Sequence, residues 1–249
     1  MKAIAVIGYH HTGKTTLVTT IIRELKARGH SVVSIKDIHS EKYRADTPGK
    51  NTALHMDAGA SAVFAKGLHD SALIFPHSLG LKDMIHYLKA DYLIIEGMKD
   101  APVPKLVCAE TTGQLDELID ETCFGISGLI AGSIESYAGL PVYCLQKSTL
   151  ELIQSVIDNS FPILPLSDPE CCSECGVSCY EMAANIVQGR AKRSDCVLDA
   201  NPQMQLKVNG REVVIVPFVQ KIIGDVVLSL VDNLKNIDPA GEIEIKVKR

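Results

Sequence analysis

The chain has 249 residues, 46% of them hydrophobic, and a formal net charge of −5 at pH 7. This length allows a complete hydrophobic core in one or two domains, and the composition is that of a globular protein. We expect no nucleic-acid partner, because the chain has no basic run with interleaved aromatics. We expect no membrane-spanning segment, because it has no stretch of about 18 apolar residues. The lack of a signal-type leader predicts a cytoplasmic location.

The first predicted element is a strand that ends at Gly8, and a helix begins near Lys14. Between them lies G-x-x-x-x-G-K-T, the phosphate-binding P-loop. Its glycines allow a tight turn that points backbone N–H groups at an anion, and the positive end of the helix adds to that attraction. The lysine would contact the β- and γ-phosphates, and Thr15 would bind Mg²⁺. We predict that nucleotide is bound by Gly8, His10, His11, Thr12, Gly13, Lys14, Thr15 and Thr16.

A β-α-β unit is expected at the start, with its helix over 14–28 and its second strand over 31–36. The polar loop 37–51 follows that strand. Ligands of open parallel sheets bind at the carboxyl ends of the strands, so this loop carries candidate site residues. These candidates are His39, Asp46, Thr47 and Lys50. A loop that is merely solvated is the alternative.

The remaining elements of this first part alternate between helices and strands. Helices are expected over 52–60, 79–89 and 148–158, the last opened by a capping box in which Ser148 precedes Glu151. Apolar stretches occupy 61–65 and 71–75, and further strands are expected over 105–110, 124–130 and 141–145.

The segment D-Y-L-I-I-E-G-M-K, residues 91–99, has the form of a Walker B strand. Its acid, Glu96, would face Thr15 across the Mg²⁺ site. A glutamate reaches one methylene further than the commoner aspartate, so it would contact Mg²⁺ through water or orient the attacking water. The alternative is a buried strand with an unremarkable carboxylate at its edge.

A cysteine-rich segment begins after Pro165 and precedes a short predicted helix. Three local thiolates and one distant thiolate suit a [4Fe–4S] cluster, and tetrahedral Zn²⁺ is the alternative. The pattern resembles the cluster-binding domains of corrinoid iron–sulfur proteins and Rnf-type electron-transfer subunits. The expected ligands are Cys172, Cys175, Cys179 and Cys196, with Cys171 as an alternative to Cys172. The other cysteines are expected in the core, at Cys108, Cys123 and Cys144.

The C-terminal part should form a small α+β domain around this cysteine cluster. Asn209-Gly210 predicts a hairpin, and a long helix over 218–235 and a strand over 243–247 follow. We therefore predict an α/β P-loop NTPase domain with a mostly parallel sheet over 1–165, and a cysteine-rich domain over 166–249.

The first part also resembles the MobB family, whose members act in molybdopterin guanine dinucleotide biosynthesis. The shared features are G-Y-H-H-T-G-K-T-T, K-D-I-H-S, A-D-T-P-G-K-N, D-A-G-A-S, I-I-E-G-M-K and V-P-K-L-V. The resemblance implies a slow, often dimeric GTPase that works beside the guanylyltransferase that joins GMP to molybdopterin. It also implies site roles for Asp46 and Lys50 and the Walker B role for Glu96. No Asn-Lys-x-Asp guanine-reading motif occurs, so guanine selectivity rests on the resemblance.

The favoured hypothesis is a GTP-binding, Mg²⁺-requiring accessory protein of molybdenum or tungsten cofactor biosynthesis. Lys14 and Mg²⁺ would stabilise charge while Glu96 or Asp46 positions the attacking water. The alternative is a nucleotide-gated metallochaperone or partner-binding switch with little turnover. A small-molecule kinase is disfavoured, because the chain has no arginine between Arg44 and Arg190 that could clamp a transferred phosphoryl group.

Overall fold

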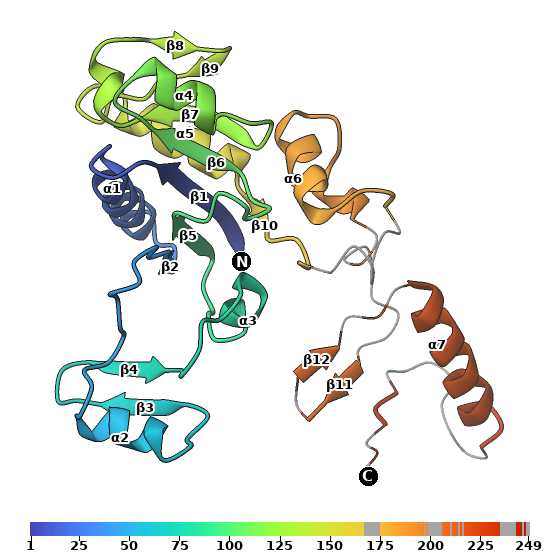
Figure 1. The fold of residues 1–249 in the computed structure, drawn as a ribbon. Helices are drawn as coiled ribbons and strands as arrows, with labels where there is room; N and C mark the ends of the chain where they lie inside the picture. The colour runs from blue at the N-terminus through green and yellow to red at the C-terminus, as the bar shows by residue number, and fades with distance from the viewer. Residues whose placement is uncertain are drawn as a thin grey trace. The chain divides into compact units, whose positions relative to one another are not determined.

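The computed structural model describes residues 1–166, 175–196, 198, 206–209, 211–213, 215, 217–234, 243–245 and 247. Its central feature is a parallel sheet with the strand order β2-β5-β1-β6-β7 (Figure 1). The strands are β1 (Lys2–Gly8), β2 (Val32–Lys36), β5 (Tyr92–Glu96), β6 (Lys105–Cys108) and β7 (Cys123–Ser127). A sixth strand, β10 (Phe161–Pro162), pairs antiparallel with the start of β1. The predicted α/β fold with a mostly parallel sheet is confirmed.

Helices cover both faces of this sheet, which explains why its strands read as nearly continuous apolar runs. On one face, α1 (Lys14–Ala27) and α5 (Thr149–Asn159) pack over Ile4 and Val6 of β1. On the other face, α3 (Leu81–Ile85) and α4 (Thr112–Leu118) pack in the cluster that contains Ala5 and Ile7. Successive residues of β1 thus pack against the helices on opposite faces of the sheet. The carboxyl end of β1 lies at the edge of the sheet formed by the carboxyl ends of its parallel strands.

A separate hairpin is formed by β3 (Val63–Lys66) and β4 (Ser71–Ile74), and α2 (Asn51–Asp57) precedes it (Figure 1). The apolar stretches predicted at 61–65 and 71–75 are therefore strands of their own antiparallel sheet. The helices predicted at 52–60 and 79–89 exist but are shorter, as α2 and α3.

Two local predictions near the end of the first part are wrong. Residues 141–145 do not form a strand of the main sheet: β9 (Leu140–Pro141) pairs with β8 (Ser136–Tyr137), and only Val142 makes an isolated parallel bridge, to Ile126. The capping box at α5 also fails, because the Ser148 hydroxyl donates to the Cys144 carbonyl at 3.0 Å and makes no cap hydrogen bond.

Sequence reasoning missed α4 and the break after β7. The Thr111 side chain caps α4 by accepting from the backbone N–H of Gln114, a signal that is present in the sequence. The strand predicted over 124–130 ends at Ser127, where Gly128 has a φ of 92° and leads into the 3-10 turn η1 (Leu129–Gly132).

The chain divides into two compact units, one of residues 1–166 and 179–193 and the other of 167–178 and 194–249. The first unit includes α6 (Cys179–Val187), the helix predicted after the cysteines. The second contains β11 (Leu206–Val208), β12 (Arg211–Val213) and α7 (Pro217–Val231), as predicted, whereas the described residues of 243–247 are not in a strand. The domain boundary near residue 165 stays a prediction. No helix in the described part of the chain is long and apolar enough to cross a membrane.

Candidate functional site

The loop between β1 and α1 has the backbone geometry that a phosphate cradle requires. Gly8 has a φ of 151°, and a Cβ placed on it would lie 2.2 Å from the Cys108 carbonyl oxygen, so no other residue fits there. Gly13, with a φ of 96°, turns the chain into α1. Both values are ones that side-chain-bearing residues rarely adopt. The loop therefore opens the N-terminus of α1 toward the sheet edge.

The lysine of this loop lies over the pocket with its ammonium held by protein. Lys14 Nζ donates to the Tyr9 carbonyl oxygen, and the Thr12 hydroxyl donates to the same oxygen at 2.9 Å. Burial lowers the pKa of Lys14, and the neighbouring charge of Glu96 opposes that shift. Burial also raises the pKa of Cys108, beneath the loop, to about 12, so this thiol stays neutral at pH 7.

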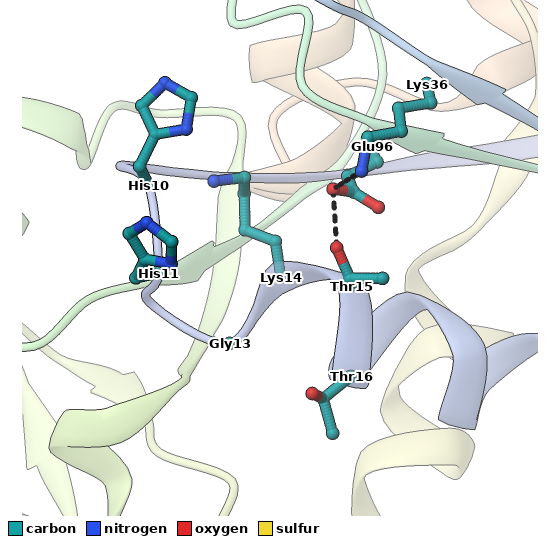
Figure 2. Close-up of a pocket in the computed structure, with 8 residues that line it drawn as sticks. All are labelled: His10, His11, Gly13, Lys14, Thr15, Thr16, Lys36 and Glu96. Carbon is teal, nitrogen blue, oxygen red and sulfur yellow. Dashed lines mark hydrogen bonds and ion pairs between the residues drawn. The ribbon is translucent and has the colours of Figure 1, made fainter.

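Three side chains from three elements meet beside the loop (Figure 2). The Thr15 hydroxyl of α1 donates to Glu96 Oε1 at 2.9 Å, and Lys36 Nζ of β2 lies 2.9 Å from the same oxygen. Thr15 and Glu96 are where the Walker arrangement places them, because the carboxyl end of β5 lies beside that of β1. A hydroxyl and a carboxylate at this range are the hard oxygen ligands that Mg²⁺ prefers, so the pair fits a magnesium ion.

These groups line one pocket with a volume of about 400 Å³. Its lining residues are His10, His11, Gly13, Lys14, Thr15, Thr16, Lys36 and Glu96. The volume lies within the range of small-ligand sites, and two lysines, a helix N-terminus and a hydroxyl make the pocket suitable for a polyphosphate.

Comparisons with known proteins identify the family to which the chain belongs. The sequence profile described as "MobB: Molybdopterin guanine dinucleotide synthesis protein B" matches residues 3–126. A protein of Haemophilus influenzae named "Molybdopterin-guanine dinucleotide biosynthesis adapter protein" is 32% identical over 131 residues, which are 50% of this chain and 72% of that protein. The chain belongs to the MobB family.

Another relative and a solved structure are similar to a larger share of this chain. A Methanocaldococcus jannaschii protein, provisionally assigned as a molybdopterin-guanine dinucleotide biosynthesis adapter protein, is 28% identical over 99% of this chain and 97% of its own length. The crystal structure of Bacillus subtilis MobB has the same fold, with a TM-score of 0.53 and 24% identity, over 62% of this chain and 98% of that chain. The archaeal relative thus also spans the C-terminal part of this MobB-family chain.

The MobB-family pocket gathers most, but not all, of the residues predicted for nucleotide binding. Gly8 and Thr12 lie within the loop and shape it rather than line the pocket. Within 1–166, which the structure describes without a gap, Asp46 and Lys50 are not among the lining residues. Lys50 instead precedes α2 as its N-cap residue.

Lys36 is the pocket residue that sequence reasoning missed. It is the last residue of β2 and stands opposite Glu96 in the parallel register. The family-like segment K-D-I-H-S begins at this residue, but the segment itself does not reveal that the lysine points at the Walker B acid. The contact depends on two strands brought together from positions 60 residues apart.

The predicted iron–sulfur ligands are only partly described. Cys171 and Cys172 lie outside the described residues, and among the described residues no group of three or more histidine, cysteine, aspartate or glutamate side chains is arranged to hold a metal ion. The [4Fe–4S] cluster therefore stays a prediction. Two of the cysteines expected in the core are there, Cys108 and Cys123, whereas Cys144 is only half-buried.

Proposed function

We propose that this chain binds GTP with Mg²⁺ in the pocket of the P-loop and hydrolyses it slowly, as an accessory protein in molybdenum or tungsten cofactor biosynthesis. The observation that carries the proposal is the Thr15–Glu96 contact of 2.9 Å beside a glycine-shaped loop. Membership of the MobB family and the names of its relatives support the role in cofactor biosynthesis. The partners would be molybdopterin and the guanylyltransferase, and a cytoplasmic location stays a prediction.

The roles of the side chains follow from their positions in the pocket. The backbone of the loop and Lys14 would hold the β- and γ-phosphates, and Lys14 would leave the Tyr9 carbonyl to do so. Thr15 and Glu96 would hold Mg²⁺, which when bound neutralises charge on the phosphates. Glu96 is better placed than Asp46 to orient water, because only Glu96 lines the pocket.

The composition of the pocket also favours slow turnover. Among its described lining residues there is no arginine, and an arginine that contacts the transferred phosphoryl group accelerates such hydrolysis by about 10³- to 10⁵-fold. This observation supports the second candidate function, a nucleotide-gated metallochaperone or partner-binding switch. Nucleotide-dependent affinity for the guanylyltransferase, with negligible GTP turnover by the chain alone, would favour that second function.

A binding and turnover assay on Lys14→Ala tests the nucleotide site. We expect GTP affinity and hydrolysis to fall by about a hundredfold, the scale of a lost charged contact at a reacting centre. Lys26→Ala is the matched control, because Lys26 is an exposed lysine of the same helix and does not line the pocket. Equal affinities and rates for Lys14→Ala and the unchanged protein would remove the assignment. The same assay with ATP decides the base.

A homodimer is part of the proposal, and the β3–β4 hairpin is its proposed interface. Phe64 and Leu73 are cross-strand partners on one face, with 68% and 39% of their surface exposed. Burial would stabilise this exposed pair, and we propose that a second copy of the hairpin covers it. Light scattering should show a dimer, and Phe64→Glu should dissociate it. Leu150→Glu, which changes an equally exposed residue on α5, is the control and should leave the dimer intact. If the unchanged protein is a monomer, the proposed dimer is wrong.

The cysteine cluster is proposed on the pattern of the sequence. Cys172, Cys175, Cys179 and Cys196 would bind a [4Fe–4S] cluster or Zn²⁺. Iron, sulfide and zinc analysis of protein purified without oxygen tests this. Stoichiometric iron and sulfide would support the cluster, zinc alone would support the alternative, and a sample without metal would end both.

A further inference from the structure

We propose that Lys36 is the internal counter-ion of Glu96. In the nucleotide-free site its ammonium pairs with the Glu96 carboxylate and competes there with the divalent cation. This inference rests on the proposed function of the pocket and adds a positioning residue to it. Lys36 lies outside the two motifs that define the site, the P-loop and the Walker B strand.

The strand register explains why the two residues meet. β2 and β5 run parallel, with Lys36 opposite Glu96, and each is the last residue of its strand. Neighbouring strands lie about 4.8 Å apart, so directly opposite side chains lie on the same face and within reach of each other. Both therefore project into the pocket at the carboxyl edge of the sheet, as Figure 2 shows.

The two partners differ in how much water surrounds them. The side chain of Glu96 is 10% exposed, and that of Lys36 is 56% exposed. A buried carboxylate without a positive partner is costly, whereas an exposed ammonium loses little when it leaves an ion pair. Glu96 therefore needs a cation in every state of the site, and Lys36 is the partner that can be exchanged.

The contact uses the same carboxylate atom as the proposed metal site. Lys36 Nζ and the Thr15 hydroxyl both donate to Glu96 Oε1, each at 2.9 Å. A divalent cation held by Thr15 and Glu96 would repel an ammonium at that oxygen and displace it. Because Lys36 lines the same pocket as Lys14, the freed ammonium would be available to the proposed polyphosphate. A surface ion pair that only steadies the edge strand would not affect cation affinity.

Manganese binding to the nucleotide-free protein, followed by electron paramagnetic resonance, tests the competition without any turnover. We expect Lys36→Gln to bind Mn²⁺ about tenfold more tightly than the unchanged protein, because the competing charge is gone. Lys36→Arg should bind it no more tightly than the unchanged protein, since a guanidinium keeps the charge and pairs well with a carboxylate. Lys26→Gln is the control for a lost surface charge.

The double substitution Lys36→Gln with Glu96→Gln locates the effect. If Lys36→Gln tightens Mn²⁺ binding in the unchanged protein but makes no difference when added to Glu96→Gln, the gain acts through Glu96 and the proposal stands. Unchanged Mn²⁺ affinity in Lys36→Gln, or a gain that survives the loss of Glu96, would overturn it. The result is separable from the proposed GTP site: Lys14→Ala without effect on GTP refutes that site, whereas a failed Mn²⁺ series with an effective Lys14→Ala refutes only the role of Lys36.

Discussion

Two lysine–carboxylate pairs in the same unit have opposite exposure. In the pocket, Lys36 is 56% exposed and Glu96 10%, with their charged atoms 2.9 Å apart. At the start of β6, Lys105 is 0% exposed and Asp120 40%, with a separation of 3.6 Å. The exposed lysine can change partners, whereas the buried one is held where it is. The first pair thus suits a site that binds ions. The second suits a fixed structural contact between elements, which we call the anchor.

The buried lysine is held mainly by α6. The hydroxyl of Tyr180, in the first turn of that helix, lies 2.6 Å from Lys105 Nζ and donates to Asp120 Oδ2 at 2.6 Å. The Tyr180 ring also lies against the ammonium, which is 4.3 Å from the ring centroid. A bidentate pair between Arg190 and Glu121 fixes the residues after the same helix. These contacts attach α6 to the start of β6 and to the residues just before β7.

Lys105→Ala should have the largest effect on stability. It removes a fully buried side chain and its contacts with Tyr180, so the free energy of unfolding should fall by about 3 kcal/mol. Urea unfolding measures this, with Lys36→Ala as the exposed counterpart. Equal losses from both substitutions would contradict the distinction between anchor and exchangeable pair.

Tyr180→Phe should have an intermediate effect. It keeps the ring over Lys105 and removes only the hydroxyl, which bonds both Lys105 and Asp120, so we expect a loss of about 2 kcal/mol, the usual value of two hydrogen bonds. Thermal or urea unfolding measures the loss. Tyr137→Phe, which removes an exposed hydroxyl from Asp116, is the control. A loss as large as that of Lys105→Ala would mean that the hydroxyl, not the packing, carries the anchor.

Alkaline pH should reveal the buried lysine with a smaller effect. Burial lowers the pKa of Lys105, so the unfolded chain binds more protons than the folded chain between that lowered value and the ordinary value of 10.5. Stability therefore rises with pH across this interval. Relative to Lys105→Met, the unchanged protein should gain stability as pH rises from neutral toward 10. The comparison stays below pH 10 because burial raises the pKa of Tyr180, so above its ordinary value of 10.0 the unfolded chain loses that proton while the folded chain keeps it, and stability falls. A difference independent of pH would contradict this prediction.

Lys36→Gln should have the smallest effect on unfolding. Its side chain is largely in water, and with Mn²⁺ present to pair with Glu96 the substitution should change the free energy of unfolding by less than about 0.5 kcal/mol. The same urea series measures it. A loss of several times that size would show that the pocket pair is structural, and it would weaken the inference of an exchangeable counter-ion.

The sequence was sufficient for features that a known motif encodes, including the contact between Thr15 and Glu96, which lie 81 positions apart. The P-loop, α1 and the acid at the end of β5 follow from short motifs and apolar periodicity, and the structure brings Thr15 and Glu96 together as expected. The same reasoning could not find the partners of Lys36 and Lys105. Those contacts join residues 60 and 75 positions apart that no motif links, and strand register and helix docking decide them.

The local errors have a different cause, which is competition between hydrogen-bond partners. Ser148 has the right spacing from Glu151 for a capping box, but its hydroxyl donates to the carbonyl of Cys144 instead. Pro141 pairs with Ser136 in the β8–β9 hairpin, and the segment after it makes a single bridge to the main sheet instead of a full ladder. Composition alone does not rank such alternatives.

The assignment of residues 179–193 to the first unit has a practical consequence. A protein shortened after residue 166 would keep every strand of the main sheet, yet it would lose the aromatic cover of Lys105. Trimming at 166 would therefore uncover an ammonium group that the intact fold shields from water. The shortest protein that keeps the nucleotide-binding unit with Lys105 covered should therefore extend through residue 193.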